Sequence, residues 1–134
     1  MTNLEDAVDR WRASIEIPAD VHAPEAARNI VAALLPAWDL GDLISDAQLI
    51  ASELVTNAYR HAQGTAGFEL LLVQRDAGVR IALADGSSIK PVIAELSHER
   101  PSGRGMMLVS ALCTEWGSES RDGGKQVWAD LDRT

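Results

Sequence analysis

The chain has 134 residues, of which 46% are hydrophobic and 24% are charged, proportions that are ordinary for one globular domain with a single core. Its formal net charge is −8, so its surface repels phosphodiester backbones and we expect no direct nucleic-acid binding. Cys113 is the single cysteine, which excludes an internal disulfide and a thiolate metal cluster and fits a cytoplasmic location. No stretch reaches the roughly 18 apolar residues of a membrane span, so we expect no membrane association.

The first predicted elements are an N-terminal arm, a strand and a helix. The arm covers residues 1–10, and residues 11–17 alternate between apolar and polar types, which predicts a strand. Pro24 suits the first turn of a helix, and Pro36 and Gly41 mark its end. The apolar side chains that this helix would turn inward are Ala27, Ile30, Val31, Leu34 and Leu35.

A second helix is predicted over residues 43–62, where apolar side chains recur at about 100° per residue and Asp42 suits the N-cap. Its apolar stripe consists of Leu43, Ala47, Ile50, Leu54 and Ala58. Two strands are predicted next, over residues 67–75 and 79–84. Residues 85–102 contain glycine, proline, serine and charged residues, and we interpret them as a loop or lid.

The last predicted elements are a third helix, from residue 103 or 104 to residue 115, and two closing strands over residues 116–120 and 126–131. Helices that are segregated from a mostly antiparallel sheet indicate an α+β fold. We therefore expect one domain over residues 11–134, a two-layer α/β sandwich in which three helices cover one face of the sheet.

The first candidate functional motif lies on the second predicted helix. Glu53 and Asn57 are four residues apart, so a helix stacks them on one face, at the edge of its apolar stripe. An amide oxygen is a hard ligand suited to Mg²⁺, and a nearby carboxylate can orient or deprotonate a nucleophile. The alternative is a solvated helix edge on which Glu53 and Arg60 are ordinary surface charges, and the spacing alone favours that alternative.

The second candidate motif is Asp85-Gly86, directly after the apolar strand over residues 79–84. A carboxylate at the end of a strand can accept a hydrogen bond from an exocyclic amine, and the glycine lets a ligand approach the backbone. The alternative is an ordinary turn, because Asp-Gly is a common turn pair.

The third candidate motif is Gly103-Arg104-Gly105, at the start of a strongly apolar predicted helix. Backbone N–H groups at a helix N-terminus favour phosphate, and an arginine adds a fixed positive charge. The alternative is a flexible hinge before a core helix. A lone Gly-x-Gly is a weak signal, and its place at a junction of loop and helix strengthens it.

These motifs occur in the order, and with the flanking elements, of the GHKL (Bergerat-fold) ATPase superfamily. Four segments carry the resemblance: ASELVTNAYRHA (51–62) resembles the N box, ALADGSS (82–88) a reduced first glycine box, SGRGMMLVSALCTEWG (102–117) the second glycine box and its helix, and GGKQVWADL (123–131) the terminal strand. The resemblance covers residues 11–131 and is closest to the stand-alone anti-sigma-factor serine kinases.

The resemblance assigns roles to the residues of the N box. Asn57 matches the asparagine that binds Mg²⁺, and Glu53 matches the carboxylate that acts as general base on the attacking hydroxyl. Arg60 falls where related proteins place a basic residue that contacts phosphate. The cofactors that the resemblance implies are ATP and Mg²⁺.

The two glycine boxes complete the nucleotide site that the resemblance implies. Asp85 matches the aspartate that accepts the adenine amino group, and Gly86 lies beside it. Gly103 and Gly105 match the glycines that wrap the phosphates, with Arg104 between them. The implied reaction is transfer of the γ-phosphoryl group to a serine of a partner protein, through positioning and charge neutralisation.

The chain also departs from the family pattern at three places. The first glycine box usually continues Asp-x-Gly-x-Gly, whereas residues 85–89 are DGSSI. The loop before Gly103 is short, which reduces the ATP lid. The terminal strand of relatives often has a threonine near the adenine aspartate, and Gln126 occupies about that place.

Two functional hypotheses follow. The first is an ATP-binding regulator of the anti-sigma-factor type that phosphorylates a serine of an anti-sigma-factor antagonist, with the antagonist or a sigma factor as partner; because relatives often form dimers, a homodimer is compatible with it. The alternative is a non-catalytic, partner-binding regulatory module with a degenerate nucleotide pocket, which the altered glycine box and the short lid favour. An unrelated acidic α+β scaffold would explain the composition but not the ordered motifs.

Overall fold

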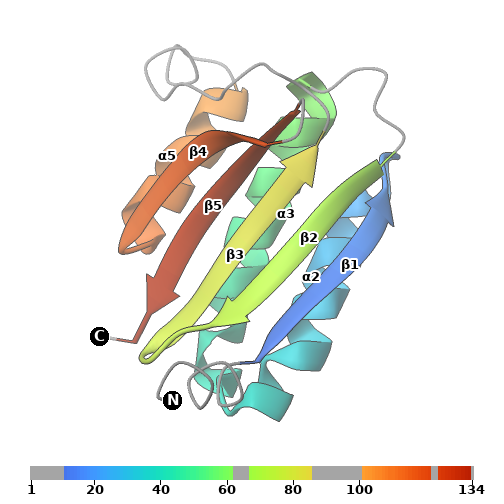
Figure 1. Ribbon diagram of the computed structural model, residues 1–134. Helices are drawn as coiled ribbons and strands as arrows, with labels where there is room; N and C mark the ends of the chain where they lie inside the picture. The colour runs from blue at the N-terminus through green and yellow to red at the C-terminus, as the bar shows by residue number, and fades with distance from the viewer. Residues whose placement is uncertain (1–10, 62–66, 86–100, 122–123, 134) are drawn as a thin grey trace.

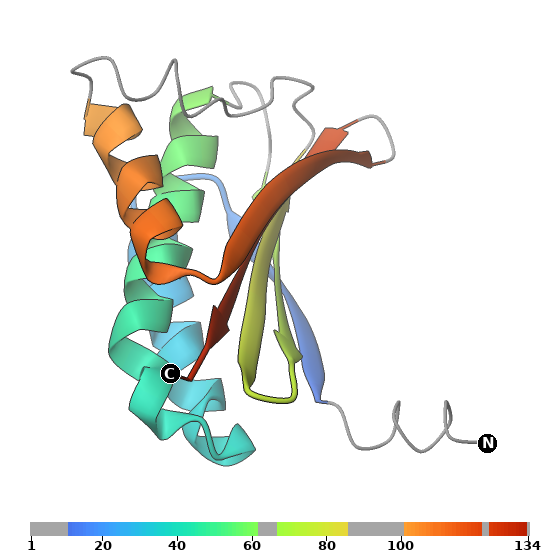
Figure 2. The ribbon, with the colours of Figure 1, turned by 90° about the vertical axis from the view of Figure 1, so that its left-hand side faces the viewer.

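The computed structural model describes residues 11–61, 67–85, 101–121 and 124–133, and of residues 61, 101–105 and 121 it describes only the backbone. These residues form an α+β sandwich in which the helices cover one face of an antiparallel sheet (Figures 1 and 2), so the predicted fold class is confirmed. The predicted arm and most of the predicted lid lie outside the described residues.

The sheet has five strands in the order β1-β2-β3-β5-β4, and each neighbouring pair is antiparallel. The strands are β1 (Arg12–Pro18), β2 (Gly67–Gln74), β3 (Gly78–Asp85), β4 (Glu115–Arg121) and β5 (Gly124–Asp132). All five lie within two residues of the predicted strands. The central strands are paired through apolar residues, such as Leu72 of β2 with Ile81 of β3, and Ile81 with Ala129 of β5.

The described α-helices are α2 (Ala23–Leu34), α3 (Ile44–His61) and α5 (Pro101–Leu112). The helix α2 ends at Leu34, just before Pro36, and Pro36 and Gly41 each begin a short 3-10 helix, η1 (Pro36–Trp38) and η2 (Gly41–Leu43). The middle helix, α3, packs against both α2 and α5 and lies over β3 and β5. In the described part of the chain, no helix combines the length and the apolar character needed to cross a membrane.

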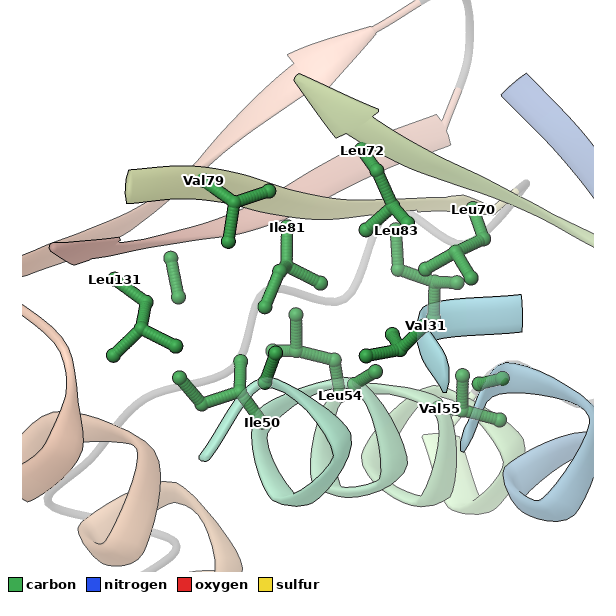
Figure 3. Close-up of a cluster of buried hydrophobic side chains, with 14 of the residues drawn as sticks. Val31, Ile50, Leu54, Val55, Leu70, Leu72, Val79, Ile81, Leu83 and Leu131 are labelled. Atoms are coloured by element: carbon green, nitrogen blue, oxygen red, sulfur yellow. The ribbon is translucent and has the colours of Figure 1, made fainter. Parts of the chain in front are cut away.

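The core lies between the helices and the sheet, where side chains of α2, α3, β2, β3 and β5 point toward one another (Figure 3). All five residues of the predicted α3 stripe are buried. On α2, Ala27 and Val31 are fully buried, while Ile30 and Leu34 are partly buried against the core. Burial of each large aliphatic side chain contributes about 1.5–3 kcal/mol, so these contacts fix α3 firmly on the sheet.

Candidate functional site

The segments that carry the predicted motifs meet at one end of the sandwich. The last turns of α3, the tip of β3, the start of β5 and the start of α5 all lie at the upper end in Figures 1 and 2. Contacts of α3 with α5, β3 and β5 hold this arrangement together. Residues that are far apart in the sequence, such as Asn57 and Asp85, are therefore carried to the same end of the fold.

Asn57 lies in the last turns of α3 and is only 4% exposed. Its Oδ1 atom is buried and has no hydrogen-bond partner among the residues that the structure describes. Such an oxygen costs about 1–3 kcal/mol when it stays unsatisfied, so it needs an explanation. This burial rules out a solvated helix edge at this position and fits an oxygen that is kept available to a hard cation such as Mg²⁺.

Glu53 and Arg60 flank Asn57 on the same helix but are more accessible. Glu53 lies one turn before Asn57 and is half-buried, so part of its side chain stays in contact with solvent. Arg60 is exposed near the end of α3. The surface-charge interpretation therefore still holds for Arg60, whereas Glu53 lies one helical turn from Asn57, whose Oδ1 has no partner among the described residues.

The glycines of the third motif lie inside the first turns of α5 rather than at its tip. The helix begins at Pro101, two residues earlier than predicted, because proline suits the first helical position. In a helix with this start, the N–H groups of residues 102 and 103 have no intrahelical acceptor, but the N–H of Gly105 has one. The backbone N–H of Gly103 is therefore placed to donate to a phosphate. Gly105 has no side chain, so a phosphate could instead approach its backbone closely.

The place opposite Asp85 is occupied by Lys125, not by Gln126. Asp85 of β3 is the register partner of Lys125 of β5, while Gln126 pairs with Ala84. Gln126, which we expected at about this place, is one position away on β5. Successive strand residues alternate between the two faces of a sheet, so Lys125 shares the helix-covered face with Val127 and Gln126 lies on the other face. Gly86, the predicted neighbour of Asp85, lies outside the described residues.

Lys125 is 1% exposed and is among the largest fully buried side chains of the chain. Burial lowers the pKa of Lys125, and the negative charge of Asp85 acts in the opposite direction. Sequence reasoning missed this residue, although the alternation of Val127, Ala129 and Leu131 could have placed it on the inner face. The site therefore contains a buried cation at its strand end in addition to the predicted residues.

The histidine kinase-like ATPase domain family matches residues 17–131, and the chain belongs to this family. The match begins at Ile17, near the end of β1, and ends at Leu131, one residue before the end of β5. A comparison with curated proteins gives no match. Membership implies a nucleotide-binding domain, and the buried oxygen of Asn57 fits the magnesium that would accompany a nucleotide.

Proposed function

We propose that the chain is a regulator of the anti-sigma-factor type, which binds ATP with Mg²⁺ and phosphorylates a serine of an anti-sigma-factor antagonist. The observation that carries the proposal is the Oδ1 of Asn57 in the last turns of α3, which is buried and has no partner among the described residues. A purely structural asparagine would satisfy this oxygen within the protein. A magnesium ligand must keep it free until the metal arrives.

Three of the predicted residues would have defined tasks in this reaction. Asn57 would hold Mg²⁺, which neutralises phosphate charge when bound. The N–H of Gly103, which has no acceptor within α5, would hold phosphate oxygens. Glu53 would accept the proton of the serine hydroxyl as the serine oxygen bonds to the γ-phosphorus and the bond from that phosphorus to the bridging oxygen breaks, which releases ADP.

The proposed partners follow from the resemblance to anti-sigma-factor kinases. They are an anti-sigma-factor antagonist, which presents the serine, and a sigma factor, which the chain would bind. The acidic surface, with a formal net charge of −8, supports protein partners rather than direct contact with DNA. We place the reaction in the cytoplasm, and a homodimer is compatible with it.

The kinase proposal is tested by transfer of labelled phosphate from ATP to a purified cognate antagonist. We expect the wild-type chain to label one serine of the antagonist, and substitution of that serine by alanine to abolish the labelling. The antagonist must first be shown to bind the chain in a pull-down. If it binds but receives no phosphate, the chain is not its kinase.

A second candidate is a partner-binding module that no longer uses a nucleotide. The observation that favours it is Lys125, a buried residue that is the register partner of Asp85, the residue that matches the adenine-binding aspartate of relatives. Calorimetric titration with Mg-ATP separates the two candidates. Micromolar binding that Asn57→Ala abolishes excludes the module, whereas partner binding without any nucleotide binding supports it.

A further inference from the structure

The strand β1 forms one edge of the sheet, and its outer side is open. In the order β1-β2-β3-β5-β4, β1 pairs with β2 on one side, and no described strand lies on its other side (Figure 1). An edge of this kind presents unpaired backbone N–H and C=O groups that can pair with another strand. Which strand fits there depends on the spacing and the charges of the residues along the edge.

The backbone of every second residue of β1 points away from β2. The N–H of Gln74 donates to the carbonyl oxygen of Trp11 at 2.8 Å, so the carbonyl group of Trp11 points toward β2. This direction alternates along an antiparallel strand, so the backbone groups of Arg12, Ser14 and Glu16 point toward the open edge. The side chains of these three residues are exposed, on the sheet face opposite the core.

The charges along this edge are self-complementary. An antiparallel β1 strand from a second copy of the chain, centred on Ser14, places Arg12 of each copy opposite Glu16 of the other. In each of these pairs the backbone groups point toward the neighbouring strand, so the pair exchanges two backbone hydrogen bonds. A register centred on Arg12 or on Glu16 places like charges opposite each other, which is destabilising. A shift of two residues in either direction places Ser14 opposite a charged residue. The register centred on Ser14 therefore pairs both charges of the edge.

Within one copy, the charges of this edge lack an opposite charge. Neither Arg12 nor Glu16 has a hydrogen bond or an ion pair among the described residues. The register partner of Glu16 on β2 is Glu69, so two carboxylates lie opposite each other on one face, and like charges in that position repel. Arg12 of a second copy would bring a guanidinium to Glu16 and offset this repulsion.

The same register also covers apolar surface on the helix side of the edge. Ala13 and Ile15 lie on that side and are only partly buried, and the register places Ala13 of each copy opposite Ile15 of the other. Trp11, which is 58% exposed, comes opposite Ile17 of the second copy. Burial of apolar surface drives most protein association, whereas exposed ion pairs add little by themselves. The charges would therefore select the register, and the apolar contacts would supply most of the affinity.

We propose that β1 is a homodimerisation edge, on which two copies of the chain pair antiparallel about Ser14 and join their sheets into one. A two-fold axis through this pair makes the contact isologous, so the assembly closes at two copies and neither copy keeps an open β1 edge. The inference does not rest on the proposed phosphate transfer, because Arg12, Ser14 and Glu16 lie outside the candidate nucleotide site. It names the surface and the register through which a dimer would form.

The test is sedimentation velocity of the full chain without nucleotide, from about 1 μM to about 100 μM. We expect the wild type to dimerise within this range. Arg12→Glu makes both charged positions of the edge acidic, and Glu16→Arg makes both basic. Because each variant then faces its own copy with like charges at both pairs, we expect the dissociation constant of the dimer to rise at least about tenfold.

Glu119→Arg is the matched control, because it makes the same charge reversal at an exposed position of β4, the strand at the other edge of the sheet. This variant should dimerise as the wild type does. A wild type that stays monomeric at the highest concentration overturns the proposal. So does a dimer that Arg12→Glu and Glu16→Arg leave unchanged, since it would use another surface.

An equimolar mixture of Arg12→Glu and Glu16→Arg separates lost complementarity from lost folding. In a mixed dimer the acidic edge of one variant meets the basic edge of the other, so opposite charges face each other at both pairs. We expect the mixture to dimerise with an affinity near that of the wild type. A mixture that stays monomeric overturns the proposed register.

A second measurement uses the wild-type chain and does not depend on the folding of a variant. Amide hydrogen exchange is compared at a concentration where the chain is a monomer and at one where it is a dimer. The N–H groups of Arg12, Ser14 and Glu16 should exchange more slowly in the dimer, because carbonyl groups of the second strand accept from them. Equal exchange of these amides at the two concentrations overturns the proposal.

Discussion

Arg80 of β3 and Asp130 of β5 face each other on the side of the sheet that the helices leave uncovered, with 2.6 Å between Arg80 Nε and Asp130 Oδ1 (Figure 2). Arg75 donates to the same carboxylate at 3.0 Å. The Arg80 guanidinium also stacks over the ring of Trp128, 4.2 Å from its centroid. The Asp130 side chain is only 3% exposed, so the two guanidinium groups replace the water that it has lost.

We expect Asp130→Asn to lower the free energy of unfolding by about 1–3 kcal/mol. The substitution leaves two guanidinium groups without their shared carboxylate. Both arginines are about one-third exposed, at 35% and 38%, so solvent limits the loss. Urea unfolding measures it, with Asp42→Asn in the exposed Arg133 pair as the control. Equal losses in the two variants would contradict a special role for the buried carboxylate.

Acid should lower the free energy of unfolding because Asp132, which pairs with Arg75, becomes protonated. The hydrogen bonds that Arg75 donates hold the pKa of Asp132 below its usual 3.8. A carboxyl group with a lowered pKa in the folded state stabilises the fold above its unfolded pKa. That contribution is lost as the pH falls from about 4 through the folded pKa. Urea unfolding from pH 7 to pH 3 should give a flatter dependence for Asp132→Asn than for the wild type, and parallel curves would refute this.

Gly78, at the start of β3, has no room for a side chain. A Cβ atom there would lie 1.9 Å from the backbone oxygen of Leu131 and 2.6 Å from Cα of Asp132. Because backbone atoms must move to relieve these contacts, we expect Gly78→Ala to destabilise the fold by about 3 kcal/mol. Gly41→Ala is the control, since no atom lies within 4 Å of its Cβ position. Thermal unfolding of both variants checks the prediction, and similar midpoints would disprove it.

The sequence was sufficient to predict the layers of the fold because its periodic patterns are strong. The α3 stripe, from Leu43 to Ala58, repeats at helical spacing and is buried as expected. The start of α5 was less predictable, because Gly103 and Gly105 indicate a junction while Pro101 allows the helix to begin earlier. Local signals of this kind compete, and the contacts of α5 with α3 favour the longer helix.

The sequence was sufficient to predict which motifs supply the candidate site, but not which residue of β5 lies opposite Asp85 of β3. The spacing of Glu53 and Asn57 indicated a shared helix face, but not that the oxygen of Asn57 would be buried with no partner in the part of the chain that the structure describes. The neighbour of Asp85 depends on the register of β3 with β5, which is set by packing along both strands. A shift of one residue exchanges Lys125 for Gln126, and with it the charged residue opposite Asp85.

Asn57→Ala should weaken binding of magnesium nucleotide by about tenfold or more, which is the loss of one good ligand contact. The folded state should lose little stability without ligand, because the substitution also removes the unsatisfied buried oxygen. Asn29→Ala, at an exposed position on α2, is the matched control. Calorimetry gives the affinity and thermal unfolding gives the stability. Unchanged affinity in Asn57→Ala would remove the metal ligand from the proposed site.

Glu53→Gln separates chemistry from binding. The amide keeps the size of the side chain on α3 but cannot accept the serine proton, so we expect the rate of phosphate transfer to fall by about 10²–10⁴-fold. Affinity for magnesium nucleotide should stay near the wild-type value, because the half-buried Glu53 lies one turn before the proposed ligand Asn57. Glu25→Gln, exposed in the first turn of α2, is the control and should transfer phosphate at the wild-type rate. Single-turnover transfer to the antagonist measures the rate of phosphate transfer for both variants. A Glu53→Gln variant that is as fast as the control would show that another group accepts the proton.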